Sequence, residues 1–503
     1  MVFISSFDKI ELFLQNNTDT IFIIYYSTVM DGKAYIYQKI ASNLEHKILS
    51  GSFKAGEKLP SVRTISRENG ISISTVLQAY YSLESKGLIE SRPQSGYYVI
   101  HCTKLSPDMV STSGPDKQAD PQETEHLIAR VYSEIGTSSN LLFSLGVPER
   151  ELLPVAKLSK SLVQATRALD AGGVGYEPVQ GNLRLRRQVA RYSYTWEGNL
   201  KEDDIVTSAG GMSALAYCIM SLASRGDSIA VESPVYFGIL QLARGLGLNV
   251  IELPTNALTG IELEVLEQHL KAGRIQLCLL ISNFSNPLGS CMPDDHKKRV
   301  VELMEHYNIP LIEDDLYGDV YFGKQRPRTL KTFDKSGNVL LCGAVSKTLA
   351  PGYRVGWVAP GKYKDRILKA KLYQNVSGTS VTQEAIGHFL ENGRYENHLR
   401  KLRHTLHGNS LNFIRTIAEH FPDGTKVTRP QGSFILWLEL PPAINTITLY
   451  EKALPLGISI APGRMFTLQD QYYNCLRLSY GMQWSERVEQ GLIALGAIAH
   501  DSL

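Results

Sequence analysis

Hydrophobic positions along the chain fall into three successive patterns. Over residues 31–101, apolar residues recur at helical spacing and then in two short runs around a tip with Pro and Gly, which predicts three helices and a β-hairpin. Over residues 140–390, short apolar runs alternate with helical stretches, which predicts a large α/β domain with a mainly parallel sheet covered on both faces. Over residues 391–503, helices flank a second short set of strands, which predicts a smaller α+β lobe.

The expected elements can be placed by residue. Ser61 is expected to cap a helix over Val62–Glu68, and Ser72 is expected to cap the next helix, which Gly87 stops. In the central region the expected strands are Asp204–Ser208, Ser228–Glu232, Asn249–Leu253, Gln276–Ser282, Pro310–Glu313, Val339–Cys342 and Val355–Ala359. Those of the smaller lobe lie around residues 433–440 and 474–479.

Two segments lack these patterns. Residues 1–30 hold one short apolar run with no patterned neighbour, so either Met30 is the native start or the segment adds an element to the first domain. Residues 102–139 begin with a stretch rich in Ser, Thr, Pro and Asp, and we expect them to form a linker.

Composition narrows the class of protein. The chain has 503 residues, of which 43% are apolar and 20% charged, as in soluble globular proteins of several domains. A net charge of +2 gives the whole chain no strong field for nucleic acid or membranes. The six cysteines are far apart and the N-terminus lacks a secretory pattern, so we expect reduced thiols, no metal site and a cytoplasmic location.

Three helices followed by a hairpin form a winged helix-turn-helix, a fold that binds DNA. Small polar residues at the start of the third helix suit the major groove, and basic residues before it and at the hairpin suit phosphates or the minor groove. The candidate DNA-binding residues are Arg63, Ser72, Ser74, Thr75, Arg92 and Gly96. Residues 31–101 carry nine basic and six acidic side chains, and this modest excess leaves open a winged helix that contacts protein.

Particular residues of this region favour DNA. The segment from Lys58 to Val99 resembles the DNA-binding domain of the GntR family of bacterial regulators over its whole length. The matching residues are Leu59-Pro60-Ser61, Arg63, Gly70, Ser72, Thr75-Val76, Gly87-Leu88-Ile89 and Gly96. The segment departs from the family at Ile73, where Arg is common, and this implies one phosphate contact fewer.

Lys347 is the main candidate for chemistry in the central region. It lies between two expected strands, where lost hydration lowers the pKa of an amine and makes it a nucleophile for a Schiff base. Ser346 and Arg354 flank it and can bind an anion. Taken alone, a lysine in such a loop is usually a solvated surface residue.

Other polar residues also follow the ends of expected strands, where ligands bind in open α/β sheets. Asp314 and Tyr317 can bind a cationic aromatic ring, and Asn286 presents an amide on a rigid turn. Taken alone, the acids could equally be helix caps. The remaining candidates are Gly211 and Met212 at a helix start suited to an anion, Tyr236 for stacking on a ring, and Arg477 for a carboxylate.

An amine, an acid, an amide, an anion cradle and a stacking ring together suit pyridoxal 5′-phosphate (PLP). Residues 140–500 resemble fold type I PLP enzymes of the aspartate aminotransferase family. The resemblance implies that Lys347 bonds covalently to PLP and that Asp314 pairs with its pyridine nitrogen. It also implies the following contacts: Asn286 and Tyr317 to the ring oxygen, Tyr236 stacked on the ring, Gly211, Met212, Ser346 and Arg354 to the phosphate, Tyr176 to the partner subunit's phosphate, and Arg477 to an amino-acid carboxylate. Met212-Ser213 departs from the usual Gln pair.

A GntR-type winged helix joined to such a domain resembles the MocR subfamily of transcriptional regulators. The resemblance implies a homodimer that binds a DNA operator, with each DNA-binding domain packed on the partner's large domain. PLP, an amino acid or an amine would then act as effector through aldimine chemistry. An aminotransferase with a vestigial DNA-binding domain is the alternative, and a scaffold with an empty pocket is a third, weaker one.

Overall fold

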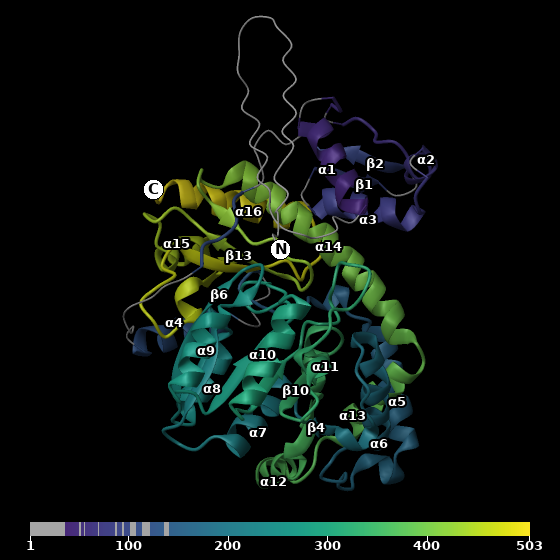
Figure 1. Ribbon diagram of the computed structural model, residues 1–503, viewed down its shortest axis with the longest axis vertical. Helices are drawn as coiled ribbons and strands as arrows, with labels where there is room; N and C mark the ends of the chain where they lie inside the picture. Colours follow the sequence, from purple (N-terminus) through teal and green to yellow (C-terminus); the bar gives the residue numbers. More distant parts are fainter. Residues whose placement is uncertain are drawn as a thin grey trace, which may run out of the picture.

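The computed structural model describes residues 36–49, 52–54, 56–68, 70–85, 88–92, 95–100, 107–112, 121–134 and 140–503 (Figure 1). The expectations for residues 1–30, including Met30 as a start, lie outside these ranges. Among the described residues, no helix is both long and apolar enough to cross a membrane, and no cluster of His, Cys, Asp and Glu suits a metal ion.

The first domain is the expected winged helix. Its elements are α1 (Ile36–Leu49), α2 (Val62–Glu68), α3 (Ile73–Ser85), β1 (Ile89–Arg92) and β2 (Gly96–Val99). The strands pair antiparallel, with Ile89 opposite Val99. Ser61 and Ser72 cap α2 and α3 as expected, because each hydroxyl accepts the backbone N–H of the residue three positions later at 3.1 Å. A small core that includes Leu44, Ile65, Val76, Leu83 and Ile89 holds the domain together.

The large domain is built on an eight-stranded sheet in the order β4-β11-β10-β9-β8-β5-β6-β7. The strands are β4 (Val206–Ser208), β5 (Ser228–Ser233), β6 (Asn249–Asn256), β7 (Gly260–Ile261), β8 (Leu277–Leu280), β9 (Leu311–Asp314), β10 (Val339–Ala344) and β11 (Gly356–Ala359). Pairings from β10 through β6 are parallel, whereas β11 and β7 run antiparallel to their neighbours. Each of the seven expected strands is present, so the mainly parallel sheet is confirmed.

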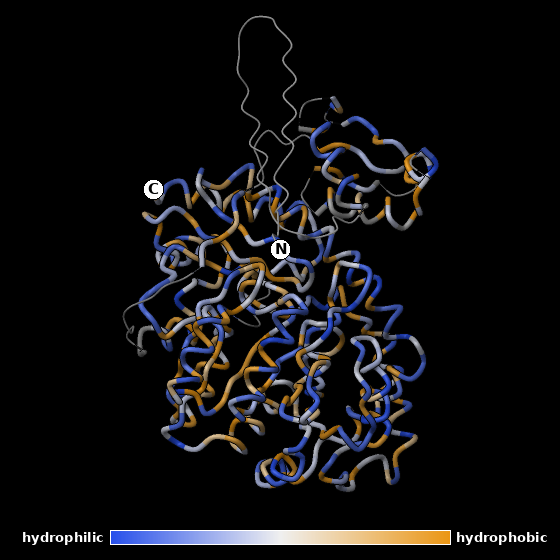
Figure 2. Tube along the Cα trace, in the orientation of Figure 1, coloured by the Kyte–Doolittle hydropathy of each residue, from blue (hydrophilic) through white to orange (hydrophobic). Residues whose placement is uncertain are grey.

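Helices cover both faces of this sheet. They are α5 (Val155–Ala168), α6 (Leu183–Tyr192), α7 (Gly211–Leu222), α8 (Phe237–Gly245), α9 (Leu263–Lys271), α10 (Asp294–His306), α11 (Leu330–Phe333), α12 (Lys364–Asn375) and α13 (Ser380–Glu391). Buried residues of α7, α8 and α12 form one core with the sheet, and those of α9, α10 and α11 form another. Figure 2 shows hydrophobic residues distributed through the interior of the domain.

The smaller lobe holds a four-stranded sheet in the order β12-β13-β16-β15. Its elements are β12 (Lys426–Val427), β13 (Ile435–Glu439), β14 (Ile458–Ser459), β15 (Ala461–Pro462), β16 (Cys475–Ser479), α14 (Arg394–His420), α15 (Thr446–Ala453) and α16 (Glu486–His500). Residues from earlier in the chain also pack here, because β3 (Leu141–Leu142) pairs with β14 and the Val427 amide donates to the Asp108 carbonyl at 2.8 Å.

The range 102–139, expected to be a linker, is partly a folded helix. Helix α4 spans Pro121–Ser133, and its residues Leu127, Ile128 and Val131 are buried in the main core. These three positions recur at helical spacing and form an apolar stripe. The polar residues before them dominate the composition of the range, so composition alone predicts a linker there.

Candidate functional site

Lys347 lies where the fully buried strand β10 gives way to a short 3₁₀ helix, Val345–Lys347. Its Nζ donates a hydrogen bond to the Gly146 carbonyl at 2.5 Å and lies 5.6 Å from the centre of the Tyr317 ring. Burial, and to a smaller extent the charge of Arg477, lower the pKa of the Lys347 amine to about 8, although Asp314 opposes this shift. At neutral pH an appreciable fraction of the amine is therefore uncharged and nucleophilic.

Asp314 ends the neighbouring strand β9 and is 5% exposed. Burial, and then the charge of Asp315, raise the pKa of the Asp314 carboxyl to about 7. Its Oδ1 atom has no hydrogen-bond partner among the described residues. A buried carboxyl with a free oxygen suits a cationic partner, and none of the ion pairs within the described ranges supplies one.

Two further polar atoms near Lys347 are buried and unpartnered within the described part of the chain. They are the Tyr317 hydroxyl and the Ser346 Oγ. Burial also raises the pKa of Tyr317, so its hydroxyl keeps the proton and can donate it to an acceptor. Buried polar groups in folded proteins rarely stay unpaired, so these atoms indicate a polar ligand between them.

Arg477 lies in the middle of strand β16 and is 1% exposed. Its Nη1 donates to Asn286 Oδ1 at 3.1 Å, and its Nη2 donates to the Ser144 carbonyl. Its Nε has no partner, and no ion pair found among the described residues includes it. A buried guanidinium without a carboxylate suits the carboxylate of a ligand.

The loop between β4 and α7 has the geometry of an anion site. Gly210 has a φ of +89°, and a Cβ there would collide with the guanidinium of Arg354, so this loop needs glycine. Arg354 donates to the Ala209 carbonyl at 3.2 Å and is exposed, and Gly211 and Met212 open α7. The amides at the start of α7 and the nearby guanidinium of Arg354 are groups that bind anions.

Tyr236 stands immediately before α8, with its ring half-buried and its centre 4.6 Å from that of Phe237. Tyr132 of α4 joins this group. Its ring centre is 5.2 Å from that of Phe237. Tyr132 therefore packs on the residue that follows Tyr236.

The structure thus brings most of the candidates together and leaves others apart. Arg477 contacts Asn286, and Lys347 lies beside the Tyr317 ring. Asp314 ends β9, which pairs with the strand that leads to Lys347. Residues missed from the sequence are Ser144, Gly146 and Tyr132, and a turn-forming Gly146-Val147-Pro148 was the available signal for one of them. Tyr176 is 86% exposed, on a different loop.

In the winged helix, Arg63 and Ser72 are exposed at the starts of α2 and α3, as is Gly96 at the hairpin, with a φ of +113°. Thr75 is partly exposed and shares a hydrogen bond with Ser72 at 2.7 Å. The side chains of Ser74 and Arg92 lie outside the described part. Ile73, where the GntR resemblance favours Arg, is 49% exposed.

Comparison with known families matches both parts of the chain. Residues 143–492 match the family "Aminotransferase class I and II", and residues 36–99 match "Bacterial regulatory proteins, gntR family".

Individual proteins resemble one part or the whole. The uncharacterized HTH-type transcriptional regulator YjiR of Escherichia coli (strain K12) is 35% identical over 93% of this chain and 99% of its own length. The aromatic-amino-acid aminotransferase 1 of Thermococcus litoralis is 27% identical over 73% of this chain and 89% of its own. The crystal structure of LysN, an α-aminoadipate aminotransferase from Thermus thermophilus complexed with N-(5′-phosphopyridoxyl)-L-leucine, superposes with a TM-score of 0.70 at 25% identity, over 76% of this chain and 97% of that one.

Proposed function

The chain belongs to the class I and II aminotransferase family and carries a gntR-family DNA-binding domain, which is the domain combination of the MocR subfamily. On this basis we propose how the protein regulates transcription. The aminotransferase-like domain holds PLP on Lys347 and captures an amino acid or amine there. This capture changes how the winged helices engage an operator. The observation that supports the proposal most directly is the set of unpartnered buried atoms on Asp314, Tyr317 and Ser346 around a lysine of lowered pKa.

The residues of the site fit PLP one by one. PLP, when bound, supplies an aldehyde that combines reversibly with amines. Asp314 would hold a proton on the pyridine nitrogen, and Tyr317 and Asn286 would bind the ring oxygen. Tyr236 would cover one ring face. The phosphate would lie against the α7 start, which holds Gly211 and Met212 and is preceded by Ala209, a contact of Arg354. Ser346 would add its unpartnered hydroxyl.

The effector is proposed to be a small amino compound, with Arg477 binding a carboxylate if it has one. Arg477 would keep its contact with Asn286 and offer the unpartnered Nε to the ligand. Tyr132 belongs to α4, which follows the DNA-binding domain in the chain, and its ring packs on Phe237 next to Tyr236. We therefore propose α4 as the element through which capture of the effector reaches the winged helix.

A homodimer completes the site in this proposal. Val174 and Tyr176 are 87% and 86% exposed, and Gly173 of the same loop lies against Val381. Large apolar side chains exposed to this degree are typical of surfaces covered by a partner. Tyr176 would then reach the phosphate held by the other subunit.

A gel shift with the DNA that flanks the chain's own gene tests the regulator function. Wild type should shift a specific band, and PLP with a suitable amine should change the apparent affinity. Lys347→Ala should bind the DNA without responding to the amine, whereas Arg63→Ala should lose affinity and keep the visible spectrum of PLP. The absence of a specific band under all conditions contradicts the regulator function.

An active aminotransferase is the second candidate, because a lysine of pKa about 8 beside a carboxylate-binding arginine also suits catalysis. Steady-state transamination assays across amino donors separate the two. Turnover at about 1 s⁻¹ or faster, in the range of ordinary enzymes, would favour the enzyme.

A further inference from the structure

A chain of hydrogen bonds joins the segment that carries Lys347 to helix α14. Thr348, the next residue, is 1% exposed, and its Oγ1 shares a hydrogen bond with the Tyr395 hydroxyl at 2.8 Å. Tyr395 lies in the first turn of α14 and donates to Asp319 Oδ2 at 3.0 Å. Helix α14 also binds the backbone of the lysine segment, because the His398 Nε2 donates to the Thr348 carbonyl at 2.6 Å.

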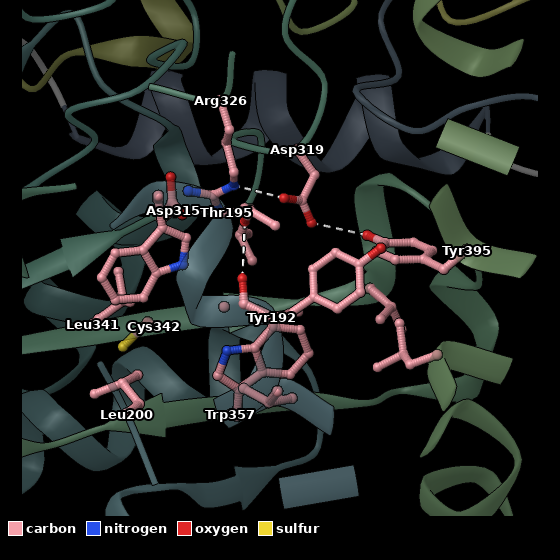
Figure 3. Close-up of a pocket in the computed structure, with 17 residues that line it drawn as sticks. Tyr192, Thr195, Leu200, Asp315, Asp319, Arg326, Leu341, Cys342, Trp357 and Tyr395 are labelled. Carbon is pink, nitrogen blue, oxygen red and sulfur yellow. Dashed lines mark hydrogen bonds and ion pairs between the residues drawn. The ribbon is translucent and has the colours of Figure 1, made fainter. Parts of the chain in front are cut away.

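The series of hydrogen bonds continues to Asp315, the residue next to Asp314 in the sequence. Asp319 Oδ1 accepts from Arg326 Nε at 2.6 Å, and Arg326 Nη2 donates to Asp315. Figure 3 shows Asp315, Arg326, Asp319 and Tyr395 around one cavity, with the Arg326–Asp319 and Asp319–Tyr395 contacts drawn. The two ends of the chain, Thr348 and Asp315, are therefore the neighbours in sequence of Lys347 and Asp314.

The protonation state of Tyr395 fixes which group donates in each of these hydrogen bonds. Burial, and then the charge of Asp319, raise the pKa of Tyr395 well above its usual value, so its hydroxyl stays protonated. With the only proton of that hydroxyl directed at Asp319, Thr348 must be the donor in the other contact. Arg403 Nε also fixes Asp319 by donating to its backbone carbonyl at 2.7 Å. Hydrogen bonds to a charged carboxylate are stronger than neutral ones.

A small cavity lies beside this segment. The cavity in Figure 3 has a volume of about 50 Å³ and is lined by consecutive residues 341–345, immediately before Ser346 and Lys347. An unfilled space deprives the residues around it of van der Waals contacts. Thr348 and its partners add specific polar contacts to the segment beside this space.

We propose that Tyr395 is a positioning residue whose hydroxyl, between Thr348 and Asp319, holds Lys347 in place relative to Asp314. The proposal rests on the proposed role of Lys347 as the lysine that carries PLP. If Tyr395 has this role, the binding of PLP at Lys347 depends on the first turns of α14, a helix that continues into the smaller lobe.

Loss of the Tyr395 hydroxyl should show in the titration of Lys347. The charged groups that face this amine are Arg477 of β16, Arg354 before β11 and Asp314 of β9, and the Tyr317 ring lies beside it. None of these is altered by Tyr395→Phe. A looser segment admits water to the amine, so its pKa should move up from about 8 towards its usual value of 10.5.

The test compares Tyr395→Phe with Tyr450→Phe, a matched control whose buried hydroxyl has no partner among the described residues. PLP is removed from each protein, and the rate of its recombination is followed by absorbance across pH. The Tyr395 variant should show a higher midpoint and release PLP about tenfold faster, as expected for one charge-assisted hydrogen bond. The Tyr450 variant should behave as wild type.

An unchanged midpoint and release rate in Tyr395→Phe would overturn the proposal. If that variant does not fold, Thr348→Val removes the other end of the same contact, and the same shift is expected. A general loss of stability would lower the melting temperature without moving the midpoint, and this result also counts against positioning. If wild type itself takes up no PLP, the proposed function fails instead.

Discussion

At the scale of single residues, the site combines groups that burial pushes towards their neutral forms. The pKa of Lys347 is lowered to about 8 and that of Asp314 raised to about 7, in both cases first by desolvation. Their mutual attraction opposes both shifts without cancelling them. The chain without cofactor therefore keeps a strained pair of groups that a cationic ring nitrogen and an aldehyde would relieve.

This strain predicts a pH dependence of stability. The folded-state pKa of Asp314 lies above its usual value of 3.8, so without cofactor its contribution to stability is lost as the pH rises through about 7. Asp314→Asn should then stabilise the cofactor-free protein at pH 8 by on the order of 1–3 kcal/mol, with a smaller gain towards pH 4. The same variant should bind PLP weakly. Denaturant melts at several pH values measure the effect.

Asp334→Asn is the control of opposite sign. Asp334 pairs with Lys331 at 2.7 Å, and despite burial its pKa is lowered, so removing its charge should destabilise the fold at pH 8. If Asp314→Asn also destabilises the cofactor-free protein and leaves PLP binding intact, Asp314 does not have the assigned role.

Arg477 offers a second prediction at this scale. Arg477→Ala removes the guanidinium from the effector side of the site, and we expect the protein still to take up PLP. The response to amino acids should weaken about ten- to hundredfold, and the response to amines without a carboxylate should persist. Absorbance titrations with matched amino acid and amine pairs measure both. Equal responses of variant and wild type to amino acids would exclude Arg477 as the carboxylate site.

Sequence reasoning found the residues that follow strands. Lys347, Asp314 and Asn286 could be grouped because the carboxyl ends of parallel strands meet at one edge of a sheet. Gly146 could not be grouped with them, because it is 201 positions from the lysine that donates to its carbonyl and follows no strand of that sheet. Contacts between the two lobes depend on tertiary packing, which local patterns do not encode.

At the scale of elements, α4 and α14 connect the site to the rest of the chain. Helix α4 lies in a range whose composition predicts a linker, and its buried stripe and Tyr132 become visible only when the helix is placed on the core. Helix α14 runs for 27 residues, and its first turns bind the lysine segment. The central strands, in contrast, were predictable because most of them contain a short apolar run.

Tyr132→Phe tests the role of α4. The change removes the hydroxyl and keeps the ring that packs on Phe237, so the fold should persist. PLP uptake and DNA binding without effector should match wild type. The change in DNA affinity on adding an effector should fall severalfold. Tyr373→Phe, at a side chain 73% exposed, is the control, and equal responses in both variants would remove α4 from the proposed route.

At the scale of the whole molecule, the two matched families place a gntR-family DNA-binding domain and an aminotransferase-like domain in one chain. This division was predictable, because the GntR-like residues and the strand-end residues fall in separate regions of the sequence. The surface proposed to join two copies was not derivable from periodicity, since exposed apolar residues become evident only in the folded structure.

Val174→Asp tests this surface. A charge there should disfavour the dimer, and sedimentation should show a larger fraction of monomer together with weaker binding of PLP. Leu258→Asp, at a side chain 54% exposed on the turn after β6, is the control and should leave the dimer intact. Dimers of unchanged stability in Val174→Asp would place the interface elsewhere.

The most direct test locates the cofactor on the chain. The purified protein is incubated with PLP, reduced with borohydride, digested and analysed by mass spectrometry. The account predicts modification of the peptide that contains Lys347 and none in Lys347→Ala. Lys371 is the informative competitor, since it is 1% exposed and burial lowers its pKa to about 8 as well. No modified peptide, or modification at Lys371 in place of Lys347, would contradict the account.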